Sequence, residues 1–198
     1  MNLALIISFL LLAYLWGSIP FGYLLTKLST GKNILKEGSG NLGSTNVRRV
    51  AGKKISIMTQ LLDMLKGFLP IVLFLVFNTT ALPPYFIYLL ALVSIVGHDF
   101  SLFLKFKGGK GVNTTLGASL LIAPLPVFVS VAVYFIVKWR FKYVSMGSIA
   151  LAIVMPLTEL ILNGITLVLY YLIISSVLIV FLHRKNIIRL LQGTELLS

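Results

Sequence analysis

The sequence predicts an all-α integral membrane protein with seven transmembrane helices, two of them short, an outside N-terminus and a cytoplasmic C-terminus. Of its 198 residues, 58% are hydrophobic and only 11% are charged, whereas a soluble domain carries about 25% charged residues. The apolar residues form long continuous runs, and the basic residues gather between alternate runs. This composition excludes a soluble enzyme, a disordered tail and a fibrous repeat, and the continuous runs exclude an alternating β-barrel pattern.

Seven apolar runs give the predicted helices in order. Residues 1–26 carry no charge and are long enough to span a bilayer. We expect a retained span there, because a signal peptide would begin with basic residues and would not contain Pro20. The later runs are 55–77, 82–97, 112–123, 125–137, 144–162 and 165–182. The runs 112–123 and 125–137 are too short to cross a ~30 Å core unaided, so six spans, with this pair fused, is the alternative.

The positions of the basic residues favour seven spans. All 17 of them except Lys66 lie within residues 27–54, 105–110, 138–142 and 184–189. Seven spans put these four segments on one side, which the positive-inside rule makes cytoplasmic, and six spans would divide them. The net charge of +12 is thus a topology signal, with attraction to membrane lipid, and we expect no nucleic-acid partner.

Three polar segments on the predicted cytoplasmic face contain the parts of a phosphate site: residues 31–54 (the first motif segment), 97–117 (the second motif segment) and 183–195 (the tail). Glycine lets backbone amides approach an anion closely, while Ser, Thr, Asn, Lys and Arg add hydrogen bonds and positive charge. The alternative role for the glycines is close helix packing.

Several common chemistries lack their residues. Residues 38–43 match GxGxxG, but no strand precedes them, and residues 108–111 lack the spacing of a Walker A loop. The five acidic residues form no carboxylate cluster and the chain has no Cys, so we expect no metal and no cofactor. Asp63 and Lys66 lie one turn apart within a span, which favours an intramembrane ion pair over a substrate contact.

The motifs together resemble one family. They are GSIP at 17–20, GSGN-x-G-x-TN-xx-R at 38–49, D-x-x-KG at 63–67, GH-x-F and FKGGKGV within 97–112, and HR-x-NI-x-RLL-x-G-x-E at 183–195. In this order they resemble the bacterial integral-membrane acyl-phosphate:glycerol-3-phosphate acyltransferases. The resemblance implies one domain, residues 1–198, in the bacterial cytoplasmic membrane, with seven helices and a cytoplasmic active site. We expect a monomer.

The resemblance also implies the reaction of phospholipid biosynthesis that the family performs. A fatty acyl group passes from acyl-phosphate to the 1-hydroxyl of glycerol 3-phosphate, giving lysophosphatidate and inorganic phosphate. Catalytic roles fall to three residues: Lys110, Arg49 and His183. Substrate-binding roles fall to ten: Ser39, Gly40, Asn41, Gly43, Thr45, Asn46, Gly108, Gly109, Ser148 and Asn186. We expect the backbone amides of Gly40, Gly43, Gly108 and Gly109 to donate to the substrates.

The mechanism expected from these residues is mainly positioning and electrostatic stabilisation. The hydroxyl proton can pass to an oxygen of the leaving phosphate, which is a substrate-assisted reaction, or to His183 as a general base. Ser44 and Asn113 depart from the resemblance, since alanine is common at both positions in the family. An organic-phosphate transporter and a non-catalytic lipid-binding subunit are the alternative functions, although the outer turns carry no basic residue to receive an anion.

Overall fold

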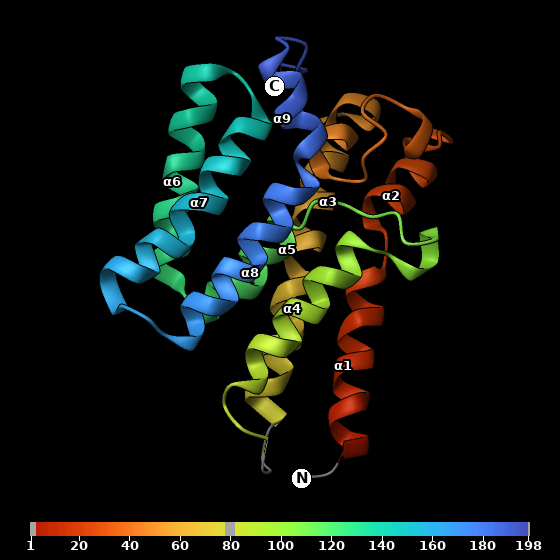
Figure 1. Ribbon diagram of the computed structural model, residues 1–198. Helices are drawn as coiled ribbons and strands as arrows, with labels where there is room; N and C mark the ends of the chain where they lie inside the picture. Colours follow the sequence, from red (N-terminus) through yellow and green to blue (C-terminus); the bar gives the residue numbers. More distant parts are fainter. Residues whose placement is uncertain (1–2, 78–81, 198) are drawn as a thin grey trace. The chain divides into compact units, whose positions relative to one another are not determined.

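The computed structural model describes residues 3–77 and 82–197, and this part of the chain contains helices and no strand (Figure 1). The turn expected after residue 77 falls on residues 78–81, and the start of the first predicted span on residues 1–2, both outside the described residues. The elements are α1 (Leu3–Ser18), α2 (Phe21–Thr30), η1 (Ile34–Lys36), α3 (Ser44–Phe77), α4 (Phe86–Asp99), η2 (Leu102–Leu104), α5 (Val112–Ile122), α6 (Pro124–Phe141), α7 (Val144–Asn163), α8 (Leu167–Leu182) and α9 (Arg184–Leu191).

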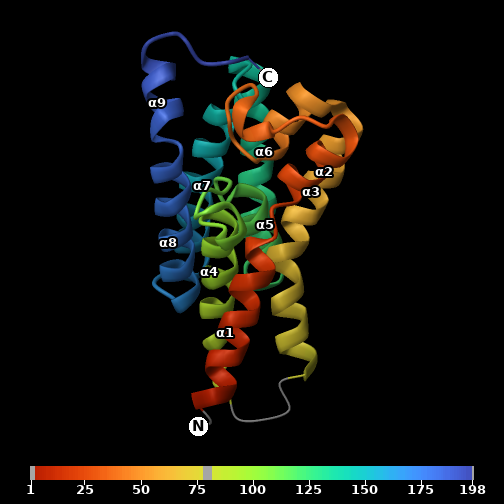
Figure 2. The same cartoon turned by 90° about the vertical axis from the view of Figure 1, so that its right-hand side faces the viewer.

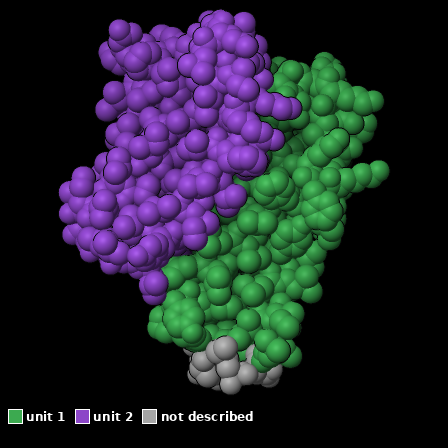
Figure 3. All heavy atoms as spheres, viewed as in Figure 1, with its two compact units in different colours: residues 1–118 green, residues 119–198 purple. Residues whose placement is uncertain are grey.

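The chain divides into two compact units, Met1–Ala118 and Ser119–Ser198 (Figure 3). In unit 1, α1 packs against α4, and α3 packs against both α2 and α4 (Figure 2). In unit 2, α7 packs against α6 and α8. The single domain expected from the sequence remains a prediction.

The helices are long and apolar enough for an integral membrane protein. Five helical stretches among the described residues reach membrane-spanning length: Leu3–Thr30, Ser44–Phe77, Phe86–Leu104, Pro124–Phe141 and Val144–Asn163. A sixth results if α8 and α9, which meet at a 55° bend, count as one span. Among the described residues, α5 is the one further apolar helix that is shorter than a span. The expectation that 125–137 is too short was wrong, because α6 continues through Lys138 and Arg140, whose positive charges suit a helix C-terminus.

The helix α3 begins eleven residues before the predicted run, at Ser44 instead of residue 55. Gly52 interrupts it with φ 84° and ψ 176°, so two helical pieces meet at a kink, in a conformation that glycine adopts readily. The Ser56 hydroxyl donates to the Ser44 carbonyl oxygen over 2.8 Å and ties the two pieces together. Half of the first motif segment is therefore helical and fixed to the membrane-spanning part of α3.

The end of α4 is fixed against α1, and this positions the second motif segment. A Cβ atom at Gly17 would contact the Ser94 carbonyl oxygen, and one at Gly97 would contact the Tyr14 carbonyl oxygen. The two helices therefore approach through their backbones, which only glycine allows. Beyond α4, the Tyr14 hydroxyl donates to the Phe100 carbonyl oxygen over 2.9 Å.

Candidate active site

Asn46, at the start of α3, organises the polar loop that precedes it. Its side chain is 1% exposed, and its Oδ1 accepts from the Ser39 amide over 2.9 Å. Its Nδ2 donates to the carbonyl oxygens of Glu37 over 3.0 Å and Asn41 over 2.9 Å. These three bonds engage both ends of the amide, so Asn46 holds the shape of the loop.

The glycine amides of this loop also donate within the protein. The Gly40 amide donates to the Glu37 carbonyl oxygen over 2.9 Å, and the Gly43 amide donates to Oδ1 of Asn41 over 2.8 Å. In the structure, both amides that we expected to donate to a substrate therefore have acceptors within the protein. Gly40 has a φ of +70°, so this glycine allows the turn to form.

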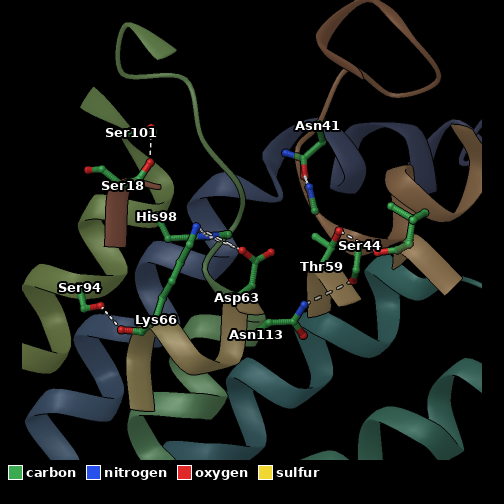
Figure 4. Close-up of polar contacts among 12 residues, drawn as sticks. Ser18, Asn41, Ser44, Thr59, Asp63, Lys66, Ser94, His98, Ser101 and Asn113 are labelled. Atoms are coloured by element: carbon green, nitrogen blue, oxygen red, sulfur yellow. Dashed lines mark hydrogen bonds and ion pairs between the residues drawn. The ribbon is translucent and has the colours of Figure 1, made fainter. Parts of the chain in front are cut away.

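The two motif segments of unit 1 touch each other. Ile34, Leu42 and Val47 form a small buried core in the first segment, and Leu104 of the second packs against it. Asn113 Nδ2 also donates to the Ser44 hydroxyl over 3.4 Å (Figure 4). The two departures from the family resemblance are thus partners in one contact.

The glycine turn, residues 108–111, packs closely on the end of α4. The Gly109 amide donates to the His98 carbonyl oxygen over 3.0 Å, so this amide also has an acceptor within the protein. A Cβ atom at Gly108 would contact the carbonyl oxygens of His98 and Asp99. Gly108 and Gly109 therefore pack closely on the end of α4, and the turn presents Lys110, which is half-buried.

A buried triad, Asp63, Lys66 and His98, lies where α3 and α4 meet (Figure 4). Lys66 Nζ is 3.2 Å from Asp63 Oδ1 and 3.4 Å from His98 Nδ1. His98 Nδ1 is 3.6 Å from the same carboxylate oxygen. The predicted ion pair is confirmed, and His98 is a neighbour of the site that sequence reasoning did not select.

In the tail, His183 has a defined ring orientation. Its Nδ1 lies 2.8 Å from the Ile179 carbonyl oxygen. A carbonyl can only accept, so Nδ1 carries the hydrogen and Nε2 of the neutral ring carries the lone pair. Nε2 is therefore the basic atom of this residue.

Glu195 ties the tail together. Its carboxylate accepts from Asn186 Nδ2 over 2.7 Å, from Arg189 Nε over 2.7 Å and from the Ser145 hydroxyl over 3.1 Å. Burial opposes ionisation, but the hydrogen bonds from these three donors outweigh it and hold the pKa of Glu195 below its ordinary value. The Ser148 hydroxyl is occupied within its own helix, donating to the Val144 carbonyl oxygen over 3.0 Å.

The predicted site residues are distributed over both units. Unit 1 contains ten of them around the two motif segments, with Arg49 and Ser39 exposed and Thr45 half-buried. Unit 2 contains Ser148, His183 and Asn186. Among residues 3–77 and 82–197, no three His, Asp or Glu side chains are grouped to hold a metal ion.

The family model described as glycerol-3-phosphate acyltransferase matches residues 7–193 of this chain. The chain belongs to this family. It is therefore an acyltransferase of phospholipid biosynthesis, and the predicted family is confirmed. The glycerol-3-phosphate acyltransferase of Clostridium acetobutylicum is 42% identical over 195 residues, covering 96% of this chain and 98% of the relative. That of Geotalea daltonii is 42% identical over 185 residues, covering 92% of each chain.

Solved structures of PlsY, an integral membrane glycerol 3-phosphate acyltransferase, share this fold. The glycerol 3-phosphate form is 36% identical with a TM-score of 0.89, covering 98% of this chain and 95% of PlsY. The lysophosphatidic acid form is 35% identical with a TM-score of 0.84, covering 97% and 94%. The apolar helices of this chain agree with its similarity to an integral membrane protein.

Proposed function

We propose that this protein transfers a fatty acyl group from acyl-phosphate to the 1-hydroxyl of glycerol 3-phosphate. The hydroxyl oxygen forms an ester bond with the acyl carbon, and the bond from that carbon to the phosphate oxygen breaks. The products are lysophosphatidate and inorganic phosphate. The observation that carries the proposal is the family match over residues 7–193, which includes nearly all of the polar motif residues. The glycerol 3-phosphate form of the related PlsY supports the acceptor.

Side chains do most of the substrate binding in this proposal, because the amides of Gly40, Gly43 and Gly109 donate within the protein. Lys110 and Arg49 supply positive charge to the two phosphate groups, and hydroxyls and amides complete their hydrogen bonding. Holding the acceptor hydroxyl against the acyl carbonyl is itself worth several kcal/mol. The remaining assigned residues follow the motifs: Ser39, Asn41, Thr45, Asn46, Gly108, Ser148, His183 and Asn186.

The hydroxyl proton has two candidate acceptors. Phosphate is a good leaving group, and its departing oxygen can take the proton, which makes the reaction substrate-assisted. His183 is the rival, because its Nε2 carries the lone pair while Nδ1 is directed to the Ile179 carbonyl oxygen. If His183→Ala abolishes turnover while glycerol 3-phosphate still binds normally, His183 is the base. If turnover falls only as far as binding weakens, the substrate takes the proton.

We also propose that the chain crosses the bacterial cytoplasmic membrane seven times as one monomeric acyltransferase domain. The N-terminus is outside, and the motif segments and the tail are cytoplasmic. The basic residues gathered in four segments support this arrangement, as does unit 1, in which α1 begins at the end where α3 finishes and α4 begins (Figures 1 and 2). In this arrangement, glycerol 3-phosphate reaches the site from the cytoplasm and the acyl chain of acyl-phosphate reaches it from the lipid.

The decisive experiment is an assay of the purified protein in lipid. We expect lysophosphatidate from acyl-phosphate and glycerol 3-phosphate, and none when acyl-CoA replaces acyl-phosphate. Lys110→Ala is expected to lower the rate by roughly a hundredfold, as loss of an electrostatic contact in a transition state does. Lys107→Ala, which changes an exposed lysine of the same segment, is the control. No product, together with counterflow of labelled phosphate in liposomes, would reject acyl transfer in favour of a phosphate transporter.

A further inference from the structure

A chain of buried contacts runs from the middle of α3 to the glycine turn that carries Lys110. We propose that the buried triad, Asp63, Lys66 and His98, positions this turn for the reaction. The inference rests on the function proposed above, because it assigns positioning residues to the same site.

The first step is the ion pair within α3 and its contact with His98 of α4. The side chains of Asp63 and Lys66 are each 2% exposed, and the ammonium group reaches both the carboxylate and His98 Nδ1. The ammonium also lies 5.1 Å from the centroid of the Phe21 ring, which favours a cation. Ionic groups inside a membrane protein are costly to bury and are usually kept for function.

The second step is the orientation of the His98 ring. A lysine ammonium can only donate, so Nδ1 of the neutral ring accepts from Lys66, and the ring hydrogen is on Nε2. Nε2 points the other way, toward the glycine turn, since a Cβ atom at Gly109 would collide with it. The ring therefore occupies the space that a side chain at position 109 would need.

The third step is the connection to the turn itself. The Gly109 amide donates to the His98 carbonyl oxygen, so backbone and side chain of one residue both contact Gly109. Next to it, the Asp99 carboxylate faces Gly111, whose added Cβ would lie 3.1 Å from both carboxylate oxygens. The end of α4 thus holds the turn on each side of Lys110.

The space beside the triad is too small for a substrate. The cavity that Asp63, Lys66 and His98 line with Ser18 and Phe21 has a volume of about 10 Å³, which is about the room for one water molecule. Glycerol 3-phosphate is far larger. We therefore assign the influence of Asp63 and Lys66 on the reaction to their contact with His98 and, through it, with the turn.

The first test exchanges His98 for two amides in the purified, lipid-embedded enzyme. His98→Gln retains an N–H group near the Nε2 position, whereas His98→Asn is too short to reach the turn. We expect His98→Asn to raise KM for glycerol 3-phosphate by roughly tenfold to a hundredfold, with a smaller change in kcat, and His98→Gln to restore most of the loss. Equal KM values for both variants and the wild type would overturn the proposal.

The second test removes the ion pair without leaving a buried charge. Asp63→Leu combined with Lys66→Met replaces the pair by apolar side chains, which proteins often tolerate in stability. We expect a thermal unfolding midpoint near that of the wild type but the same rise in KM, because nothing then orients the His98 ring. A wild-type KM in this folded double variant would refute the positioning role. If the double variant does not fold, the comparison of His98→Asn with His98→Gln still tests the positioning role.

Ser94→Ala is the matched control. Its hydroxyl donates to the Lys66 carbonyl oxygen over 2.7 Å, so it lies beside the triad but outside the chain of contacts to the turn. We expect a wild-type KM. Absence of acyl transfer in the wild type would reject the proposed function itself, whereas an active wild type with unaffected variants would reject only the triad's role.

Discussion

The charged carboxylate of Glu195 stabilises the folded tail. Its carboxylate accepts from three donors, and its side chain is 6% exposed. We expect Glu195→Gln to destabilise the protein by about 1–3 kcal/mol, because the substituted amide presents one acceptor oxygen in place of two. The thermal unfolding midpoint in detergent measures this loss. Glu37→Gln is the control, since the Glu37 carboxylate has no hydrogen bond within the described residues.

The same carboxylate predicts a pH dependence. Its pKa is lowered in the folded protein from an ordinary value of 4.5, so its stabilisation is complete above that value and is lost as pH falls through the lowered pKa. The difference in midpoint between wild type and Glu195→Gln should therefore be constant near neutral pH and shrink in acid, as pH falls through the lowered pKa. A difference that persists undiminished in acid would contradict this assignment.

Residue types and motifs could be predicted from the sequence, but the direction of each polar group could not. Asn46 and Gly109 are in the motifs as expected, yet the structure directs their hydrogen bonds to the protein itself. Ser44 and Asn113 were recognised separately as departures, and only folding brings these residues together across 69 positions. His98 is part of the GH-x-F motif, but nothing in the sequence indicates its role, because that role depends on Lys66 and Gly109 from two other segments.

At the scale of elements, the contact between α3 and α5 depends on glycine. A Cβ atom at Gly67 would contact the Thr114 carbonyl oxygen and would lie 2.7 Å from the Ala118 amide nitrogen. Backbone atoms cannot move aside as a side chain can. Gly67→Ala is therefore expected to destabilise the protein by about 1–3 kcal/mol, although alanine is the better helix former.

Val76→Ile provides the comparison, because it adds one carbon to an exposed side chain (62%) of the same helix. Thermal unfolding of the two variants in the same lipid and detergent mixture measures the difference. We expect the unfolding midpoint of Val76→Ile to match that of the wild type. Equal midpoints for Gly67→Ala and Val76→Ile would show that the helices can separate without cost.

The apolar runs predicted the helices closely, and the two failures have local causes. The start of α3 was missed because residues 44–51 are mostly polar or charged. Contacts such as that of the Ser56 hydroxyl with the Ser44 carbonyl oxygen stabilise this part of the helix. The end of α6 was missed because Lys138 and Arg140 interrupt the run in hydropathy but not in backbone conformation. The apolar pattern therefore located the apolar part of each helix correctly. It underestimated the length of helices that continue into polar or charged residues.

For the whole molecule, the number of spans determines which face carries the tail. Five stretches reach spanning length, α8 joins α9 at a bend, and α5 is short, so helix length alone leaves the count undecided. The basic residues are the independent information. If α5 and α6 each cross the membrane, the segment at Lys142 is cytoplasmic. If they form one span, that segment is outside and every later segment changes side.

Single cysteines distinguish these two arrangements, because the native chain has no Cys. Intact cells expressing Lys142→Cys or Ile165→Cys would be treated with a membrane-impermeant maleimide, since both residues are exposed. Seven spans predict labelling of Ile165→Cys alone, with Lys142→Cys labelled only after permeabilisation. Six spans predict the reverse. Lys107→Cys is cytoplasmic in both arrangements and reports whether the cells are intact, so its labelling before permeabilisation would invalidate the measurement.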